Sequence, residues 1–406
     1  MKWMRKPLAE VAELCLGKML DEKKNKGDPM PYLANVNVRW GRFDLDNLRE
    51  MRFEPHELER YRLKYGDIVM CEGGEPGRCA IWKDEEPGMM IQKALHRIRP
   101  STELDYRFLY YSFLLKGRND GFSGLFTGST IKHLPGQNLA KVEVSYPPRT
   151  EQEHIADVLC AYDDLIDNNR RRIALLEQSA RLLYREWFVH LRFPGHEHVK
   201  VVDGVPDGWC RLTLAEVCQD VEDGDWVESK DQGGNDYRLL QVSNVGVDCF
   251  VETGNFRFIS EETFRRLNCR EVHAGDVLIS RMPDPIGRAW LVTQMPWRMI
   301  TAVDVAIARV NPAIVTPYFL VQHLNAPSSM GLAAKHATGA TRLRISRRSL
   351  CALPILLPPL DLQHELDEVL SINYALRANL EKQIQRLRQA RDLLLPRLMR
   401  CELELA

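Results

Sequence analysis

The sequence lacks the features that mark several common protein classes. Its ten cysteines include no C-x-x-C pair, so their spacing does not fit a structural zinc site, and we expect reduced thiols in a cytoplasmic protein. No apolar run reaches the roughly 18 residues of a membrane span, because Pro354 and Pro358 interrupt the longest candidate. No loop fits the G-x-x-x-x-G-K-[ST] pattern, which argues against nucleotide binding.

The sequence also lacks an excess of positive or negative charge, because 55 Lys and Arg balance 56 Asp and Glu. The formal net charge is −1, whereas nucleic-acid-binding domains usually carry an excess of Lys and Arg. The distribution of charge changes that argument. Residues 305–360 contain six Lys or Arg and no Asp or Glu, and residues 94–149 contain eight against four. A solvated charged face is one interpretation. The recurrence favours another, a surface that binds a polyanion.

Residues 151–192 contain no Gly or Pro and predict one long helix. Bulky side chains recur along it at spacings of three and four residues, the pattern of a coiled-coil seam. At about 1.5 Å per residue, roughly 40 residues extend on the order of 60 Å, so the helix needs a partner of similar length. Asn169 on this seam either fixes the register or faces solvent. The predicted seam consists of Leu159, Tyr162, Ile166, Asn169, Ile173, Leu176, Ala180, Leu183 and Trp187.

The partner helix lies in the same chain, because the sequence repeats itself. Residues 127–130 (TGST) match residues 338–341 (TGAT), and Gln152 matches Gln363, always 211 positions apart. This register places a second helix at about residues 362–395. Its predicted seam includes Leu380, Ile384, Leu387 and Leu394. A repeat of this length is far above the period of roughly 20 to 50 residues that marks solenoids. The sequence therefore predicts a duplicated domain, with a long helix after each copy.

Each copy is predicted to be a mixed α/β (α+β) domain with one order of elements. A Gly-Asp turn leads into an apolar strand, a Gly- and Pro-rich loop ends in Arg, and an amphipathic segment and a strand ending in Pro-Pro follow. These elements lie at residues 65–70, 73–78, 106–116 and 142–148 in the first copy, and at 274–279, 282–288, 316–325 and 353–359 in the second.

Two loops, residues 127–134 and 338–345, are the best candidates for contact with a polyanion. Each places a Gly, which lets the backbone approach closely, among hydroxyls and basic side chains. Hydroxyls and backbone N–H groups bond to phosphate, and Arg donates a fork to guanine. A plain hairpin loop is the alternative. The candidate DNA-binding residues are Arg78, Ser129, Thr130, Lys132, His133, Arg288, Thr341, Arg342, Arg344 and Arg347.

Together these features resemble the DNA-specificity subunit of type I restriction-modification enzymes. The resemblance rests on the duplication, the Pro-Pro-x-x-x-Gln entry to each helix, the Trp187-Phe188 exit before Pro194, and the ending at 393–398 (LLLPRL). Arg400-Cys401 stands where that family usually has Ser-Gly. The family fold implies two target-recognition domains joined by two antiparallel coiled-coil helices. The domain limits are 1–150 and 211–359, the helix limits 151–192 and 360–406, and the linker 193–210.

The resemblance also implies a function. In similar proteins each domain recognises one half of a split double-stranded DNA target, and the helices fix the unspecified spacer. The helices and adjoining surfaces dock two adenine methyltransferase subunits that use S-adenosylmethionine. This core recruits two restriction subunits, which use ATP and Mg²⁺. We expect no catalytic residue, metal or cofactor in this chain.

Two other function classes remain open. Pro206-Asp207 followed by residues 228–230 (ESK) superficially matches the Pro-Asp…Glu-x-Lys arrangement of metal-dependent nucleases, although turn chemistry explains this Pro and the following Gly. Residues 145–148 (SYPP) lack both ends of the adenine methyltransferase motif. A coiled-coil adaptor without DNA binding accounts for the helices, but it leaves the paired basic segments unexplained.

Overall fold

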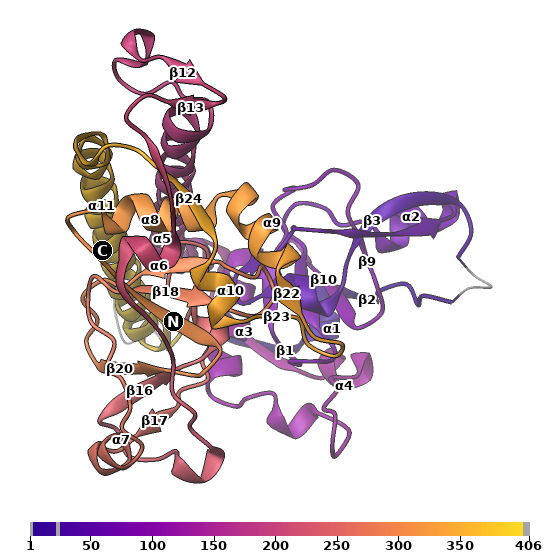
Figure 1. Cartoon of the computed structure of the whole chain (residues 1–406). Coiled ribbons are helices and arrows are strands. Elements are labelled where there is room, and N and C mark those ends of the chain that lie inside the picture. The colour runs from indigo at the N-terminus through magenta and orange to yellow at the C-terminus, as the bar shows by residue number, and fades with distance from the viewer. Residues whose placement is uncertain (1–2, 22–24, 401–406) are drawn as a thin grey trace. The chain divides into compact units, whose positions relative to one another are not determined.

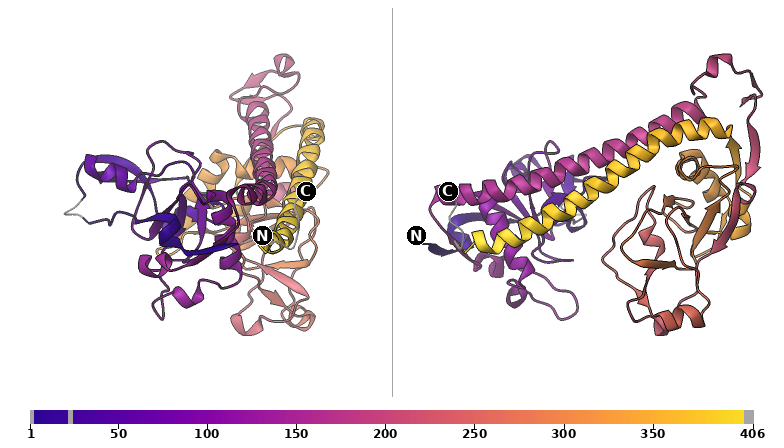
Figure 2. Two further views of the ribbon diagram at one scale, coloured as in Figure 1. Left: turned by 180° about the vertical axis from the view of Figure 1, so that it is seen from behind. Right: turned by 90° about the vertical axis from the view of Figure 1, so that its left-hand side faces the viewer.

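The computed structural model describes residues 3–21 and 25–400 and divides into two units. Unit 1 comprises Met1–Asn168 and Gln383–Ala406, and unit 2 comprises Asn169–Lys382. Each unit holds one mixed helix-and-sheet domain and part of each of two long helices, α5 (Arg149–Tyr184) and α11 (Leu360–Leu398) (Figures 1 and 2). The predicted fold class, a duplicated mixed domain joined by a helical pair, is confirmed.

The first domain is built on a four-stranded antiparallel sheet with the order β2-β10-β7-β8. It also has a three-stranded sheet, β6-β3-β9, in which β3 and β9 are parallel, and two-stranded pairs β1-β11 and β4-β5. The strands are β1 (Met4–Pro7), β2 (Ala12–Leu16), β3 (Asp28–Leu33), β4 (Val38–Arg39), β5 (Arg42–Phe43), β6 (Arg49–Phe53), β7 (Ile68–Cys71), β8 (Cys79–Ile81), β9 (Met90–Ile91), β10 (Leu95–Pro100) and β11 (Glu143–Tyr146). The helices are α1 (Leu8–Val11), α2 (Pro55–Tyr61), α3 (Tyr106–Arg118) and α4 (Gly136–Ala140).

The second domain repeats the four-stranded sheet, the three-stranded sheet and the β1-β11 pair of the first, but within the described ranges it has the pairs β12-β13 and β22-β23 and no sheet that corresponds to β4-β5. Its sheets have the orders β15-β21-β18-β19, β17-β16-β20 with β16 and β20 parallel, and β14-β24. The strands are β12 (Val201–Val202), β13 (Val205–Pro206), β14 (Cys210–Thr213), β15 (Cys218–Asp223), β16 (Tyr237–Leu240), β17 (Phe258–Ile259), β18 (Val277–Ser280), β19 (Ala289–Leu291), β20 (Arg298–Thr301), β21 (Val305–Val310), β22 (Ala337–Thr338), β23 (Arg344–Ile345) and β24 (Pro354–Leu357). The helices are α6 (Leu214–Val217), α7 (Glu261–Arg266), α8 (Pro317–Asn325), α9 (Pro327–Lys335) and α10 (Arg347–Cys351).

The predicted Gly-Asp turns lead into the central strands of both sheets. Gly66 and Gly275 have φ of 86° and 96°, a region that side chains with a Cβ rarely adopt. The aspartate that follows each of them closes the turn, because Asp67 Oδ2 accepts from the Lys64 N–H at 2.7 Å and Asp276 Oδ2 accepts from the His273 N–H at 2.9 Å. The fully buried strands β7 and β18 start directly after these turns.

In each unit a buried glutamine joins the domain to its long helix, and the two glutamines make the same set of hydrogen bonds. Gln152 Oε1 accepts from the Asp105 N–H at 2.8 Å, and its Nε2 donates to the Glu103 and Pro147 carbonyls, both at 3.0 Å. Gln363 makes the equivalent bonds to the Thr316 N–H (2.9 Å) and to the Ile314 (3.1 Å) and Pro358 (3.0 Å) carbonyls. The 211-residue register therefore holds at the level of single hydrogen bonds.

Each domain core also receives the end of the other long helix. Leu395 and Leu398, near the end of α11, lie in the same buried cluster as Phe108 of α3. In unit 2, Phe188, just beyond α5, packs edge-on against Phe319 of α8 with ring centroids 5.1 Å apart. Each core is therefore completed by two helical segments that are distant in sequence.

The seam of the helical pair follows the predicted three-and-four spacing. On α5 the predicted seam residues are all buried or half-buried, Asn169 among them. On α11 the stripe continues through Leu380, Ile384, Leu387 and Leu394, but it also includes three polar residues, Asn373, Arg377 and Arg391. Within each unit the two helices run antiparallel (Figure 2). None of the helices in the described ranges is long and apolar enough to cross a lipid bilayer.

The ends of the helices differ from the predicted limits by a few residues. The backbone of α5 ends at Tyr184 and continues as a π-helical turn, Arg185–Val189, three residues before the predicted end at Arg192. Leu191 then has φ of 57°, which no helix continues through. Helix α11 extends to Leu398 despite Pro396. The limits of the domains remain predictions.

Candidate nucleic-acid interface

In each domain the loop predicted to contact a polyanion lies beside the Gly- and Pro-rich loop that ends in Arg78 or Arg288. In the first domain the Leu134 N–H donates to the Glu72 carbonyl at 2.7 Å, and Gly73 forms a β-bridge with His133. In the second domain the Ile345 N–H donates to the Arg281 carbonyl at 3.0 Å. The turn after β7 or β18 and the following hairpin therefore form one composite surface in each domain, which we call the loop pair: residues 72–78 with 127–134, and residues 281–288 with 338–345.

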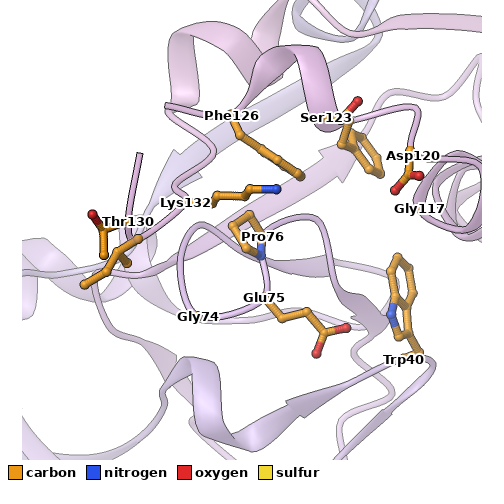
Figure 3. A pocket seen from close by; sticks show the side chains of 12 residues that line it. Trp40, Gly74, Glu75, Pro76, Gly117, Asp120, Ser123, Phe126, Thr130 and Lys132 are labelled. Carbon is orange, nitrogen blue, oxygen red and sulfur yellow. The ribbon is translucent and has the colours of Figure 1, made fainter. Parts of the chain in front are cut away.

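A hollow of about 550 Å³ opens at the first loop pair (Figure 3). Gly74 contributes from one loop, Thr130 and Lys132 from the other, and Trp40 and Phe126 lie on opposite sides of the opening. Lys132 Nζ lies 6.0 Å from the centre of the Phe126 ring. Two of the predicted DNA-binding residues thus line a concave surface with aromatic walls.

The remaining predicted residues of the first domain lie on the same loop pair but differ in exposure. Ser129 and His133 are exposed. Arg78 is turned inward, because its Nη2 donates to the Asn35 carbonyl at 3.0 Å and its Nη1 to Glu75 at 2.6 Å. The guanidinium of Arg78 therefore braces the loop that carries it.

Arg288 has a structural task that the sequence did not reveal. Its side chain is buried, and its guanidinium donates to four backbone carbonyls: those of Val245, Met282, Pro285 and Val242. Burial lowers the pKa of this guanidinium. The donors of Arg288 are therefore used inside the protein, and a contact of this residue with DNA stays a prediction.

The hairpin of the second domain presents the other predicted residues. Thr341, Arg342 and Arg347 are exposed, whereas Arg344 is half-buried and its Nε lies 2.8 Å from Asp304 Oδ1. Arg347 lies 3.8 Å from Asp223. In the described part of the chain, no carboxylate forms an ion pair with Arg342. Arg342 is therefore the strongest candidate for contact with an external anion.

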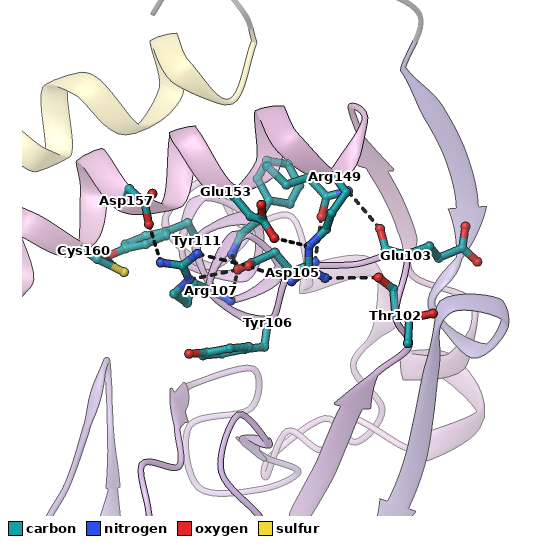
Figure 4. A network of polar contacts seen from close by, with 12 residues as sticks. Thr102, Glu103, Asp105, Tyr106, Arg107, Tyr111, Arg149, Glu153, Asp157 and Cys160 are labelled. Atoms are coloured by element: carbon teal, nitrogen blue, oxygen red, sulfur yellow. Dashed lines mark hydrogen bonds and ion pairs between the residues drawn. The ribbon is translucent and has the colours of Figure 1, made fainter.

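In the folded chain, carboxylates neutralise many of the arginines in the two basic segments. Asp304 lies one residue outside the acid-free stretch 305–360, yet it neutralises Arg344. In the first domain most arginines of residues 94–149 bind carboxylates, as Arg107 does with Asp157 at 2.5 Å and Arg149 with Glu153 at 2.8 Å (Figure 4). Arg107 of α3 thereby binds α5. The expected cationic surface is thus reduced to a few side chains on the loop pairs.

Two buried groups of polar residues leave no signal in the sequence. Arg281 is buried between the hairpin and β15, where it pairs with Asp223 and donates to the Ile345 carbonyl at 3.0 Å. Asp248 and Arg377 form a second buried cluster against the helices. Neither set has a counterpart at the matching position of the first copy, so the repeat gave no signal. Among the residues that the structure describes, no group of three His, Cys, Asp or Glu is placed to hold a metal ion.

Comparison with known proteins gives one family. Residues 1–178 match the family model described as the type I restriction modification DNA specificity domain. The chain is 24% identical over 344 residues to the type I restriction enzyme MjaIX specificity subunit of Methanocaldococcus jannaschii, covering 83% of this chain and 78% of that one. It is 22% identical over 410 residues to the EcoBI specificity subunit of Escherichia coli, covering 94% and 81%.

A solved structure shares the fold. The S subunit of the type I restriction-modification system from M. genitalium superposes with a TM-score of 0.53 at 17% sequence identity, covering 98% of this chain and 96% of that one. The duplicated domains, the helical pair and the sequence matches agree with one another. Over most of its length the chain is therefore similar to the DNA specificity subunits of type I restriction-modification systems.

Proposed function

We propose that each domain of this chain reads one half of a bipartite DNA target through its loop pair. The observation that carries this proposal is the recurrence of the same composite surface in both domains, anchored by equivalent backbone bonds. The two surfaces differ in their side chains: the first offers Thr130, Lys132 and an aromatic hollow, and the second offers Arg342 and Thr341. Surfaces that share a frame but differ in side chains suit two half-sites of different sequence.

The long helices set the distance between the half-sites in this proposal. Helix α5 has 36 residues and α11 has 39. At about 1.5 Å per residue each extends on the order of 55 Å, which exceeds one turn of duplex, roughly 34 to 36 Å. The spacer between the half-sites then follows from helix length and not from base contacts.

The helices also offer matched surfaces for partner proteins. Leu165 and Leu376 are 211 positions apart and both exposed, and so are Leu182 and Leu393. Exposed leucines at equivalent positions suit two copies of one partner. We assign them to two adenine methyltransferase subunits that carry S-adenosylmethionine. Two restriction subunits that use ATP and Mg²⁺ join this core.

In this proposal the chain itself is not catalytic. The nuclease reading requires carboxylates that are free to hold Mg²⁺. Glu228 instead pairs with Lys230 at 2.8 Å, and Glu228 Oε1 accepts from Trp226 Nε1 at 3.4 Å. The adaptor hypothesis does not explain why both domains carry a loop pair with equivalent backbone bonds. DNA reading by a non-catalytic subunit accounts for both the loops and the helices.

Selection from randomised duplex DNA tests the proposal. The chain, held by its methyltransferase partner, should enrich a motif in two parts with an unspecified gap of constant length. Arg342→Ala and Arg344→Ala should weaken binding, and loss of one phosphate contact should reduce the salt slope by about 0.9. A loss equal for all sequences identifies a phosphate contact, and a loss confined to one base pair identifies a base contact.

The matched control is Arg386→Ala, since Arg386 is exposed on α11 and belongs to neither loop pair. Enrichment of no motif would contradict DNA reading by this chain. Unchanged affinity and salt dependence in both hairpin variants would show that the DNA surface of the second domain lies elsewhere.

A further inference from the structure

A buried ionic cluster joins the second domain to both long helices. The Asp248 carboxylate accepts hydrogen bonds from Tyr374 Oη, from Gln322 Nε2 at 3.0 Å and from Arg377 Nη1 at 3.1 Å. Arg377 Nη2 also donates to the Asp248 carbonyl at 2.8 Å and to Glu177 at 3.0 Å. Gln322 lies on α8, Tyr374 and Arg377 on α11, and Glu177 on α5. The Asp248 carboxylate is therefore held by α8 and α11, and Arg377 connects it in turn to Glu177 of α5.

The cluster is closed to water at its centre. Asp248 is 4% exposed and Arg377 is 5% exposed. Burial raises the pKa of Asp248, and the neighbouring Arg377 and Tyr374 oppose this effect by favouring the carboxylate. A buried ion pair adds little net stability, because desolvation offsets the attraction, but a geometry that separates the partners leaves an uncompensated charge. Such a pair selects one arrangement of the parts it joins.

The first domain has no such cluster at the matching place. Gly41 occupies the position of Asp248, since its N–H donates to the Cys79 carbonyl as that of Asp248 donates to the Ala289 carbonyl. A Cβ at Gly41 would lie 2.6 Å from the Tyr110 hydroxyl, which leaves no room for a carboxylate.

The link between α3, α5 and α11 in unit 1 uses a different set. Asp163 of α5 accepts from Tyr111 Oη at 2.8 Å and pairs with Arg391. The Asp163 and Arg391 side chains are 25% and 12% exposed, against 4% and 6% for Asp248 and Arg377. The attachment of the second domain is the more deeply buried of the two.

We propose that Asp248 and Arg377 are positioning residues that fix the second domain on the helical pair and thereby make the protein discriminate between DNA targets that differ only in spacer length. The inference rests on the proposed function. One added base pair moves a half-site by about 3.4 Å and rotates it by about 35° around the duplex. A domain held in one orientation by a buried ion pair does not follow that movement, whereas a loosened domain does.

Binding measurements with three kinds of duplex test the inference. The first kind carries the spacer returned by selection, the second a spacer one base pair longer or shorter, and the third only the second half-site. In the complex with the methyltransferase partner, Asp248→Asn and Arg377→Met should reduce discrimination between the first two about tenfold, or ~1.4 kcal/mol. Affinity for the isolated second half-site should stay within about twofold of wild type.

The matched control is Glu252→Gln. Glu252 pairs with the buried Arg238 at 2.8 Å inside the same domain, and that pair does not reach the helices. This variant should keep wild-type discrimination even if the domain is less stable. Arg377→Lys keeps the positive charge but not the planar set of donors of the guanidinium, so it should retain part of the discrimination that Arg377→Met loses.

Two results would overturn the inference. Unchanged discrimination in both cluster variants means that the cluster does not position the domain. An equal loss of affinity for all three duplexes means that it only keeps the domain folded. If the wild-type complex prefers no spacer length, the proposed function itself fails, and this result is distinguishable because it needs no variant.

Discussion

Replacing either duplicated glutamine with leucine should destabilise its own unit by a similar amount. Gln152 and Gln363 are each 0% exposed, and each satisfies one backbone N–H and two backbone carbonyls where a domain meets its helix. Leucine has nearly the same volume but offers no polar atom. The substitution therefore removes the hydrogen bonds without opening a large cavity.

The size of the effect follows from the groups left unpaired. A buried polar group without a partner costs about 1–3 kcal/mol, and small shifts that admit water recover part of the total. For three backbone groups we expect about 3 kcal/mol in each variant. At about 2–4 °C per kcal/mol for a unit of this size, the Tm should fall by roughly 6–12 °C. The two variants should agree within about 1 kcal/mol, because their bonds are equivalent.

Differential scanning calorimetry of the full chain with its partner measures this. Gln178→Leu and Gln389→Leu are the matched controls, since these glutamines are also 211 positions apart but exposed on the long helices. Each control should change stability by less than about 0.5 kcal/mol. A Tm shift below about 1 °C in Gln152→Leu or Gln363→Leu would refute the reasoning, because it would mean that these bonds do not hold the domains to the helices.

Two further predictions concern pH and partner binding. Burial lowers the pKa of His323 to about 4, and Tyr184 Oη lies 2.9 Å from its Nδ1. In the unfolded chain the imidazole binds a proton already at a pKa near 6.5. The contribution of neutral His323 to the free energy of unfolding is therefore fully present above about pH 6.5, and it falls by about 2–3 kcal/mol as the pH drops towards 4. Urea midpoints of His323→Phe should vary less over this range than those of wild type, and identical slopes would contradict the assignment. Leu165→Asp and Leu376→Asp should each weaken methyltransferase binding about tenfold in calorimetric titration. Lys382→Asp on α11 is the control, and wild-type affinity in both leucine variants would exclude these positions from the docking surface.

The sequence predicted the architecture because its signals are local or repeated. The three-and-four spacing from Leu159 to Trp187 depends on helix geometry alone, and the structure buries that stripe. In both copies a Gly-Asp turn precedes an apolar strand, because Gly adopts the positive φ of the turn, and a Pro-Pro pair ends a strand, because Pro lacks the N–H that continues a sheet. Because the sequence repeats after 211 residues, each local signal in one copy also predicted the corresponding element of the other copy.

The candidate site was harder to predict, because it depends on contacts between distant residues. Arg288 ends a Gly- and Pro-rich loop, just as Arg78 does, but carbonyls of residues 242–245 and of its own loop surround it. The acid-free stretch 305–360 gave no hint that Asp223 and Asp304 reach Arg347 and Arg344. The end of α5 was also overestimated, since an apolar pattern continues through a π-helical turn as easily as through an α-helix.

Sequencing of adenine methylation tests the central claim most directly. The chain is purified with its methyltransferase partner, supplied with S-adenosylmethionine and DNA of varied sequence, and the methylated positions are mapped. The account predicts methylation confined to a split motif with a gap of constant length, and exchange of the half-sites when the domains are swapped at Pro206. A stable complex that methylates without sequence restriction would contradict it in favour of the adaptor, and methylation or cleavage by the chain alone would contradict its non-catalytic role.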